Sequence, residues 1–330
     1  MAYEKERRVA VEAVLKACRL CQVVREALVS EETMAKEDRS PVTVADFGSQ
    51  AVISLDLLRA FPDDPVAAEE DAADLRTPAG SALRAKVTQH VSTIVPGLSD
   101  EEILASIDRG TWAGGPTRRY WVLDPIDGTK GFLRGDQYAV ALALIEEGQI
   151  VLGVLGCPNL PIDASHPTGP KGSLFIALKG GGATVRRFDD PSETRIGVTE
   201  IADPAQAVYC ESFEDSHSSH NSTARIAAIL GVTAPPLRID SQCKYGVVAR
   251  GDVSIYLRLP PRATYEDKIW DHAAGSIVLK EAGGEVTDVY GRPLDFSLGR
   301  TLRETVGILA TNGKLHTRVL AAVRQALESD

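Results

Sequence analysis

Helical spacing of apolar residues dominates the first third of the chain. Val9, Ala13, Ala17 and Cys21 recur every four positions and would form one face of a long amphipathic helix. A second helical pattern stops at a Pro-Asp-Asp-Pro turn, and a Ser-Asp-Glu-Glu capping box opens another helix. The helices predicted here cover about residues 3–28, 50–61, 81–91 and 99–110, with the segment 40–46 leading into the second one.

Strand patterns become frequent after residue 120. Apolar runs bounded by glycine and proline turns predict strands at 66–68 and 121–124, and β-hairpins of 138–145 with 149–155 and of 174–178 with 183–188. From residue 207, strands at 207–211, 237–240 and 253–259 alternate with helices such as 219–230 and 270–282. We therefore predict an α/β protein with an α+β first half and an α/β second half. The loop 157–172 is the expected boundary between domains of residues 1–160 and 161–330.

Composition is that of an ordinary globular protein. The 330 residues are 44% hydrophobic and 25% charged, and no apolar stretch approaches the roughly 20 residues that cross a bilayer. The N-terminus lacks the apolar region of a signal peptide, so we expect a soluble, cytoplasmic protein, with nucleus or organelle left open. A net charge of -10 disfavours a nucleic-acid polymer but allows a small anionic ligand if metal supplies positive charge. We expect no membrane partner and a monomer.

The cysteines do not indicate a functional site. The chain has five, at scattered positions, which suits reduced thiols better than a disulfide framework. Cys18 and Cys21 form a Cys-x-x-Cys pair inside the predicted first helix, and no second such pair or paired histidine completes a zinc site. We expect both thiols to face the core, in preference to a redox or zinc role.

Catalytic chemistry is most strongly indicated by the run WVLDPIDGTKG from Trp121 to Gly131. Pro125 fixes one backbone angle and disfavours the helical conformation for the aspartate before it, so two carboxylates leave a stiff bend after an apolar strand. Gly128 permits close approach of the backbone to a ligand, and Thr129 can open a helix whose free amides face an anion. This combination can hold a divalent metal against a phosphate.

Acidic residues next to turn signals occur at three other places: Asp46 ahead of a helix, Glu69 with Glu70 after a strand, and Asp271 at the start of a helix. Taken singly, each is also compatible with a carboxylate at a helix N-terminus or with a solvated loop. If these acids meet the two aspartates of the WVLDPIDGTKG run in space, their mutual repulsion requires divalent cations among them. Mg²⁺ prefers such oxygen ligands and keeps waters for a substrate.

Two separated motifs carry a family resemblance. Asp124-Pro-Ile-Asp127-Gly-Thr129 and Trp270-Asp271-His-Ala-Ala274 resemble both signatures of the inositol monophosphatase-like, lithium-sensitive phosphatase superfamily. Within it, the chain most resembles 3'(2'),5'-bisphosphate nucleotidases, through segments that include SPVTVAD at 40–46 and IDSQCKY at 239–245. The resemblance covers nearly the whole chain. It implies a layered αβαβα sandwich of the inositol monophosphatase and fructose-1,6-bisphosphatase type.

The same resemblance implies roles for individual residues. Two or three Mg²⁺ ions would be bound by Glu69, Asp124, the Ile126 carbonyl, Asp127 and Asp271. Asp46 and Thr129 would orient and deprotonate the attacking water. The substrate-binding residues would be Thr129, His217, Ser241, Lys244, Arg258 and Asp271. The implied reaction is hydrolysis of adenosine 3',5'-bisphosphate, and of 3'-phosphoadenylyl sulfate, at the 3'-phosphate, with inhibition by Li⁺ and also by Na⁺.

Three other functions stay open from the sequence. An inositol polyphosphate 1-phosphatase or inositol monophosphatase would use the same fold and metal site. A haloacid-dehalogenase-type phosphatase also has two aspartates after a strand, but one residue separates them, whereas two residues separate Asp124 from Asp127. A metal-responsive nucleotide sensor would keep the ligands without activating water. Without the resemblance, His217 and Lys244 would be read as a loop histidine and a solvated helix lysine.

Overall fold

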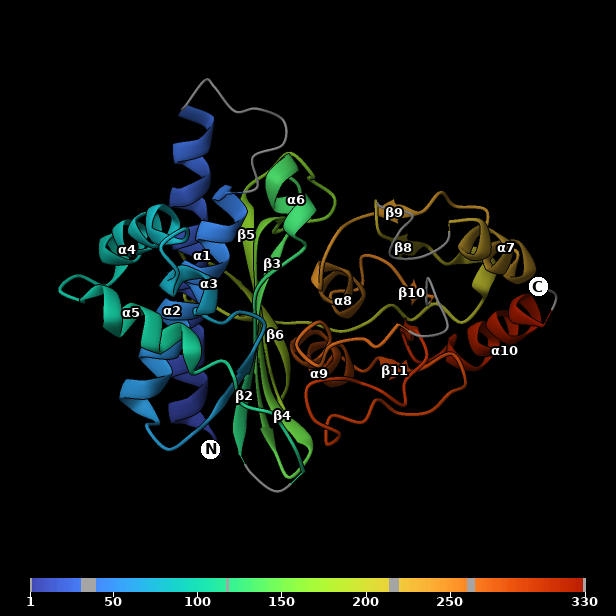
Figure 1. Cartoon of the computed structure of the whole chain (residues 1–330). Helices are drawn as coiled ribbons and strands as arrows, with labels where there is room; N and C mark the ends of the chain where they lie inside the picture. The colour runs from blue at the N-terminus through green and yellow to red at the C-terminus, as the bar shows by residue number, and fades with distance from the viewer. Residues whose placement is uncertain (1, 31–39, 117–118, 214–219, 260–264, 329–330) are drawn as a thin grey trace.

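The computed structural model describes residues 2–30, 40–116, 119–213, 220–259 and 265–328. These residues form five layers, helices alternating with two sheets (Figure 1). The first helical layer contains α1 (Glu4–Ser30), α2 (Ser40–Ala60), α3 (Ala73–Arg76), α4 (Ser81–Ile94) and α5 (Asp100–Asp108). The middle layer is α8 (Cys243–Ala249) and α9 (Ala273–Glu281), and the last is α7 (His220–Leu230) and α10 (His316–Leu327). The predicted αβαβα sandwich is confirmed.

The first sheet has seven strands in chain order: β1 (Val66–Ala68), β2 (Tyr120–Asp127), β3 (Ala139–Glu146), β4 (Gln149–Pro161), β5 (Lys171–Leu178), β6 (Gly182–Arg187) and β7 (Thr194–Arg195). Only the β1–β2 pair among these is parallel, and both predicted hairpins are present. The second sheet has the order β11-β12-β10-β8-β9, from β8 (Tyr209–Glu211), β9 (Leu237–Arg238), β10 (Ile255–Arg258), β11 (Glu285–Thr287) and β12 (Ile308–Thr311). Its β8 pairs in parallel with β9 and β10, as an α/β half requires.

The expected boundary in the loop 157–172 does not separate the two sheets. This loop connects β4 to β5, and the first sheet continues through β7 to Arg195. Its proline and glycine content reflects the turn of a hairpin, which has the same composition as a linker. A division into folding units at residues 1–160 and 161–330 stays a prediction.

The start of the second helix was predicted too late. Helix α2 begins at Ser40, so Asp46 lies inside it and not ahead of it. The β-branched run at 42–44 favours an extended chain by propensity, but Val44 and Ala45 are buried in the core that α1 and α2 share. Tertiary packing therefore outweighs local propensity at this position.

Three apolar clusters fill the spaces between the layers. Both faces of the first sheet are covered, which explains why β3 is almost continuously apolar and not alternating. Cys18 and Cys21 are buried in the first cluster as free thiols, which confirms that they face the core. Among the described residues, no helix has both the length and the apolar character that a bilayer crossing needs.

Candidate active site

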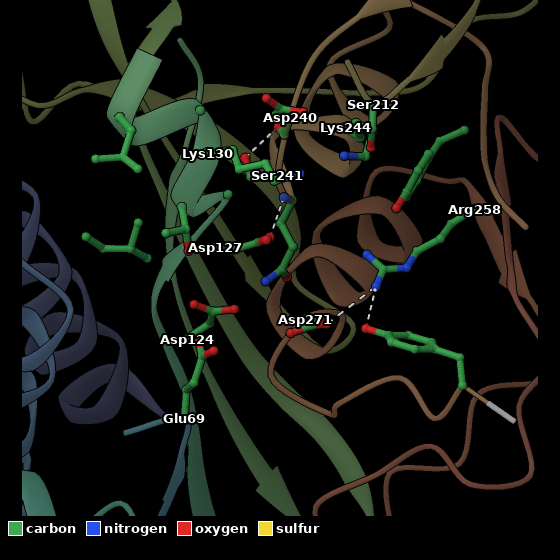
Figure 2. A pocket seen from close by; sticks show the side chains of 18 residues that line it. Glu69, Asp124, Asp127, Lys130, Ser212, Asp240, Ser241, Lys244, Arg258 and Asp271 are labelled. Carbon is green, nitrogen blue, oxygen red and sulfur yellow. Dashed lines mark hydrogen bonds and ion pairs between the residues drawn. The ribbon is translucent and has the colours of Figure 1, made fainter. Parts of the chain in front are cut away.

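A cavity of about 440 Å³ lies where the two halves of the sandwich meet. From the first half it is lined by the segments after β1 and along β2, and by the short helix α6 (Thr129–Arg134). From the second half it is lined by the start of α8, by β10 and by the residue before the α9 N-cap. Figure 2 shows Glu69, Asp124 and Asp127 on one side of this space and Lys244, Arg258 and Asp271 on the other.

The geometry of the WVLDPIDGTKG run follows from its turn residues. Pairing of β2 with β3 is interrupted between Asp124 and Asp127, so both carboxylates reach the cavity from one strand end. Gly128 adopts the left-handed conformation (φ 91°), and a Cβ there would lie 2.9 Å from the Cβ of Ser241. Only glycine therefore allows the two halves to approach so closely. The next residue, Thr129, opens α6 as predicted.

The carboxylates predicted to bind metal line the same cavity and raise one another's pKa values. Asp124 is 2% exposed, its Oδ1 has no hydrogen-bond partner, and burial followed by the neighbouring acids raises its pKa well above the ordinary value. The Glu69 side chain is exposed to the cavity. Loss of hydration inside the cavity, followed by repulsion from Glu70, raises its pKa to about 8. Burial likewise raises the pKa of Asp271 to about 6. A cluster held together against its own repulsion fits divalent cations.

Asp46 is not among the residues that line the cavity. It is 8% exposed on α2, and burial, then Glu70 and Glu69, raise its pKa well above the ordinary value. Helix α2 packs against α6, which brings the helix of Asp46 beside the helix that Thr129 opens. The two residues are therefore on adjacent elements at the edge of the acidic cluster.

The opposite wall of the cavity is cationic. Lys244 is 4% exposed, with its ammonium 5.3 Å from the Tyr256 ring, and burial lowers its pKa although Asp127 opposes the shift. It is thus not the solvated lysine that its sequence context alone would indicate. Arg258 lies 3.0 Å from Asp267 and 3.7 Å from Asp271.

The protein itself orients the Arg258 guanidinium. His272 contacts Asp267 at 3.2 Å on one side and the Tyr245 hydroxyl at 2.9 Å on the other. Asp267, Asp271 and His272 are close enough to suggest a second metal site, but Asp267 is already paired with both Arg258 and His272. This group therefore holds an arginine in place at the cavity. Asp271, at the longer distance of 3.7 Å from Arg258, stays part of the acidic cluster.

Of the predicted site residues, His217 lies outside the described residues, and Asp46 does not line the cavity. All the others line the cavity: Glu69, Asp124, Ile126, Asp127, Thr129, Ser241, Lys244, Arg258 and Asp271. Further lining residues that were not predicted include Lys130, Ser212, Asp240, Gln242, Tyr256 and Tyr265. Gln242 was inside a motif that carried the resemblance, but nothing in its neighbours in the sequence indicates which groups it would bind.

Known proteins of one family are similar to this chain over nearly its whole length. The inositol monophosphatase family model matches residues 2–328. A 3'(2'),5'-bisphosphate nucleotidase of Oryza sativa is 48% identical, over 99% of this chain and 95% of its own length. One from Schizosaccharomyces pombe is 40% identical, over 100% of this chain and 98% of its own.

Solved structures agree on the fold. An inositol monophosphatase from Anabaena (Nostoc) sp. PCC 7120 superimposes with a TM-score of 0.65 at 24% identity, covering 98% of this chain and 97% of that one. An inositol monophosphatase from Zymomonas mobilis gives a TM-score of 0.64 at 20% identity, covering 98% and 99%. At these identities the likeness establishes the layered architecture alone.

Proposed function

The chain belongs to the inositol monophosphatase family, and we propose that it is a Mg²⁺-dependent 3'(2'),5'-bisphosphate nucleotidase. It would hydrolyse adenosine 3',5'-bisphosphate to AMP and phosphate, and also act on 3'-phosphoadenylyl sulfate. The observation that carries the proposal is the pairing of two unlike walls in one cavity. Carboxylates from Glu69, Asp124 and Asp127 face Lys244 and Arg258 across a space of about 440 Å³.

The residues present fit the metal. The partnerless buried Oδ1 of Asp124 and the raised pKa values of Glu69 and Asp271 are those of oxygen ligands gathered for cations. In the proposal, these three, with Asp127 and the Ile126 carbonyl, hold two or three Mg²⁺ ions. Bound Mg²⁺ supplies positive charge beside the phosphate and lowers the pKa of coordinated water. Family members are generally Mg²⁺-dependent and Li⁺-sensitive, and we expect inhibition by Li⁺ and also by Na⁺.

Asp46 and Thr129 are assigned to the attacking water. Burial, followed by Glu70 and Glu69, raises the pKa of Asp46 well above its ordinary value, which makes its carboxylate a stronger base than an exposed one. The Thr129 hydroxyl oxygen, at the start of α6, would accept a hydrogen bond from the attacking water and so fix the direction of its attack on the 3'-phosphate.

The cationic wall is assigned to the rest of the nucleotide. Arg258 offers a planar fork and Lys244 a buried point charge, and both suit the retained 5'-phosphate. Ser241, Thr129 and Asp271 would hydrogen-bond the phosphates or the ribose. His217 would contact the nucleotide from a segment outside the described residues.

A phosphate-release panel tests the proposal. Adenosine 3',5'-bisphosphate, 3'-phosphoadenylyl sulfate, inositol 1,4-bisphosphate and inositol monophosphate are compared with and without Mg²⁺ and Li⁺. We expect the two nucleotides to give the highest kcat/KM, only with Mg²⁺. Preference for an inositol phosphate would identify the inositol phosphatase alternative instead. An acyl-phosphate trapped on Asp124 would point to the haloacid-dehalogenase route.

The sensor alternative, the oligomeric state and the compartment need separate measurements. Nucleotide binding without phosphate release in the wild-type protein would favour the sensor. The proposal includes a monomer acting in the cytoplasm. Light scattering after size exclusion and cell fractionation would test those two statements.

A further inference from the structure

Gln242 lies between the two halves of the acidic cluster. Asp127 belongs to β2 and Asp271 to the segment before α9, so their separation depends on how the halves are joined. Gln242, immediately before α8, is 2% exposed and hydrogen-bonds groups from both sides. Its contacts therefore bear on the spacing of the two carboxylates.

The backbone of Gln242 binds the first half. Its N–H donates to Asp127 Oδ2 at 2.5 Å, directed there by the left-handed conformation of Ser241 (φ 65°). A non-glycine residue in this conformation is strained and persists only where its surroundings hold it. Here the Ser241 hydroxyl donates to the Asp240 carbonyl at 2.6 Å and accepts from the Cys243 N–H at 3.2 Å.

The side chain of Gln242 binds the second half. Its Nε2 donates to the Trp270 carbonyl at 2.9 Å, one peptide unit before Asp271. Its Oε1 accepts from the Gly275 N–H at 2.9 Å. Gly275 is in the first turn of α9, where backbone N–H groups have no partner within the helix. The carboxamide thus fixes both the chain beside Asp271 and the helix that follows it.

We propose that Gln242 is a positioning residue that fixes Asp271 relative to Asp127, so that both carboxylates can bind at one metal site. The inference rests on the proposed function, because it assumes that both carboxylates serve one metal site. Replacing the carboxamide would keep the hydrogen bond to Asp127, because its donor is the backbone N–H. It would remove only the hydrogen bonds to the Trp270 carbonyl and the Gly275 N–H. The expected consequence is a weaker metal site on an intact fold.

The test compares Gln242→Met with Asn312→Leu. Asn312 is a matched control: it is also 2% exposed, donates to the carbonyls of Thr199 and Ile201, and accepts from the Leu315 N–H. It does not line the cavity described above. Mg²⁺ affinity is measured by calorimetry without nucleotide, and Tm is measured on both metal-free proteins.

We expect both variants to lose Tm, but only Gln242→Met to bind Mg²⁺ more weakly, by about 10- to 100-fold. Wild-type Mg²⁺ affinity in Gln242→Met, or an equal loss in Asn312→Leu, would overturn the inference. If Gln242→Met does not fold, Gln242→Asn replaces it, because a carboxamide shorter by one methylene cannot reach both the Trp270 carbonyl and the Gly275 N–H. Wild-type Mg²⁺ affinity in that variant, or an equal loss in Asn312→Leu, would again overturn the inference.

Failure of the proposed function gives a different result. If the wild-type protein releases phosphate from no nucleotide, the nucleotidase assignment fails. The calorimetric comparison of the two variants is unaffected by that outcome and still decides the role of Gln242.

Discussion

Removal of Mg²⁺ across a range of pH is the most direct perturbation of the acidic cluster. In the metal-free protein, Glu69 has its pKa raised from 4.5 to about 8 and Asp271 from 3.8 to about 6. A carboxyl group with a raised pKa binds its proton more tightly in the folded state than in the unfolded state. This tighter proton binding stabilises the folded protein fully at pH values below the pKa of the group in the unfolded state. The stabilisation is lost as pH rises through the pKa of the group in the folded state. The metal-free Tm should therefore fall between about pH 4.5 and 8.

Mg²⁺ should reverse this loss. A ligand at 100 times its Kd stabilises the folded state by about 2.7 kcal/mol. For 330 residues the unfolding entropy is about 0.7 kcal/mol/K, so Tm should rise by about 4 °C. Because Mg²⁺ must displace protons, its apparent affinity should increase about tenfold per pH unit between pH 6 and 8, where Glu69 loses its proton. Below pH 6 the increase should be steeper, since Asp271 also releases a proton.

Differential scanning fluorimetry with Mg²⁺ or with EDTA, from pH 5 to 8.5, measures both effects. Asp124→Asn should abolish the Mg²⁺ shift, because it removes one of the proposed anionic ligands. Asp288→Asn is the matched control: Asp288 is 1% exposed but engaged by Arg292, so this variant should lose Tm and keep the Mg²⁺ shift. A metal-free Tm that rises from pH 5 to 8, or the same Mg²⁺ shift in Asp124→Asn, would refute the reasoning.

Three further outcomes are expected. Gln50 is fully buried and hydrogen-bonds the backbone N–H and carbonyl of Glu70. Gln50→Met should therefore lower the free energy of unfolding in urea by about 2–4 kcal/mol and raise the Mg²⁺ concentration for half-maximal activity. Unchanged Mg²⁺ activation would mean that Gln50 contributes to stability alone. Asp46→Asn should lower kcat by about 10²- to 10⁴-fold while equilibrium dialysis still detects nucleotide binding; near-normal kcat would exclude Asp46 as base. Arg258→Gln should raise KM for adenosine 3',5'-bisphosphate more than for inositol 1,4-bisphosphate; equal losses would contradict a nucleotide-specific wall.

Local patterns were sufficient to predict many of the helices and strands, whereas the five-layer arrangement was predicted from the family resemblance. The helical period that includes Val9 and Ala13, and the turn glycines of the β3–β4 and β5–β6 hairpins, act over a few residues and are readable without the fold. The start of α2 was not readable in this way, because its β-branched residues are helical only when Val44 packs against α1. Errors arose where distant contacts outweighed local preference.

The same distinction applies to the site. Asp124, Asp127 and Thr129 were predictable because one short run sets their geometry. The contribution of Gln242 and Arg300 was not, because their partners are distant in sequence. Arg300 donates to the carbonyls of Ala68, Gly110 and Trp112, and its guanidinium is 4.6 Å from the centre of the Trp270 ring. It therefore joins the strand before Glu69 to the segment before Asp271, and no spacing of residues in the sequence predicts this connection.

Charge balance in the cavity connects the acidic chain to an acidic substrate. Two pairs cancel locally, Arg134 with Asp240 and Arg258 with Asp267. Four lining carboxylates then face two lysines, a net charge of 2 − 4 = −2; these residues are Glu69, Asp124, Asp127, Asp271, Lys130 and Lys244. A substrate with two phosphate monoesters adds about −3 to −4 near neutral pH. Two or three divalent ions offset most of this sum, whereas one ion leaves most of it in place. This charge balance supports the two or three Mg²⁺ ions that we propose.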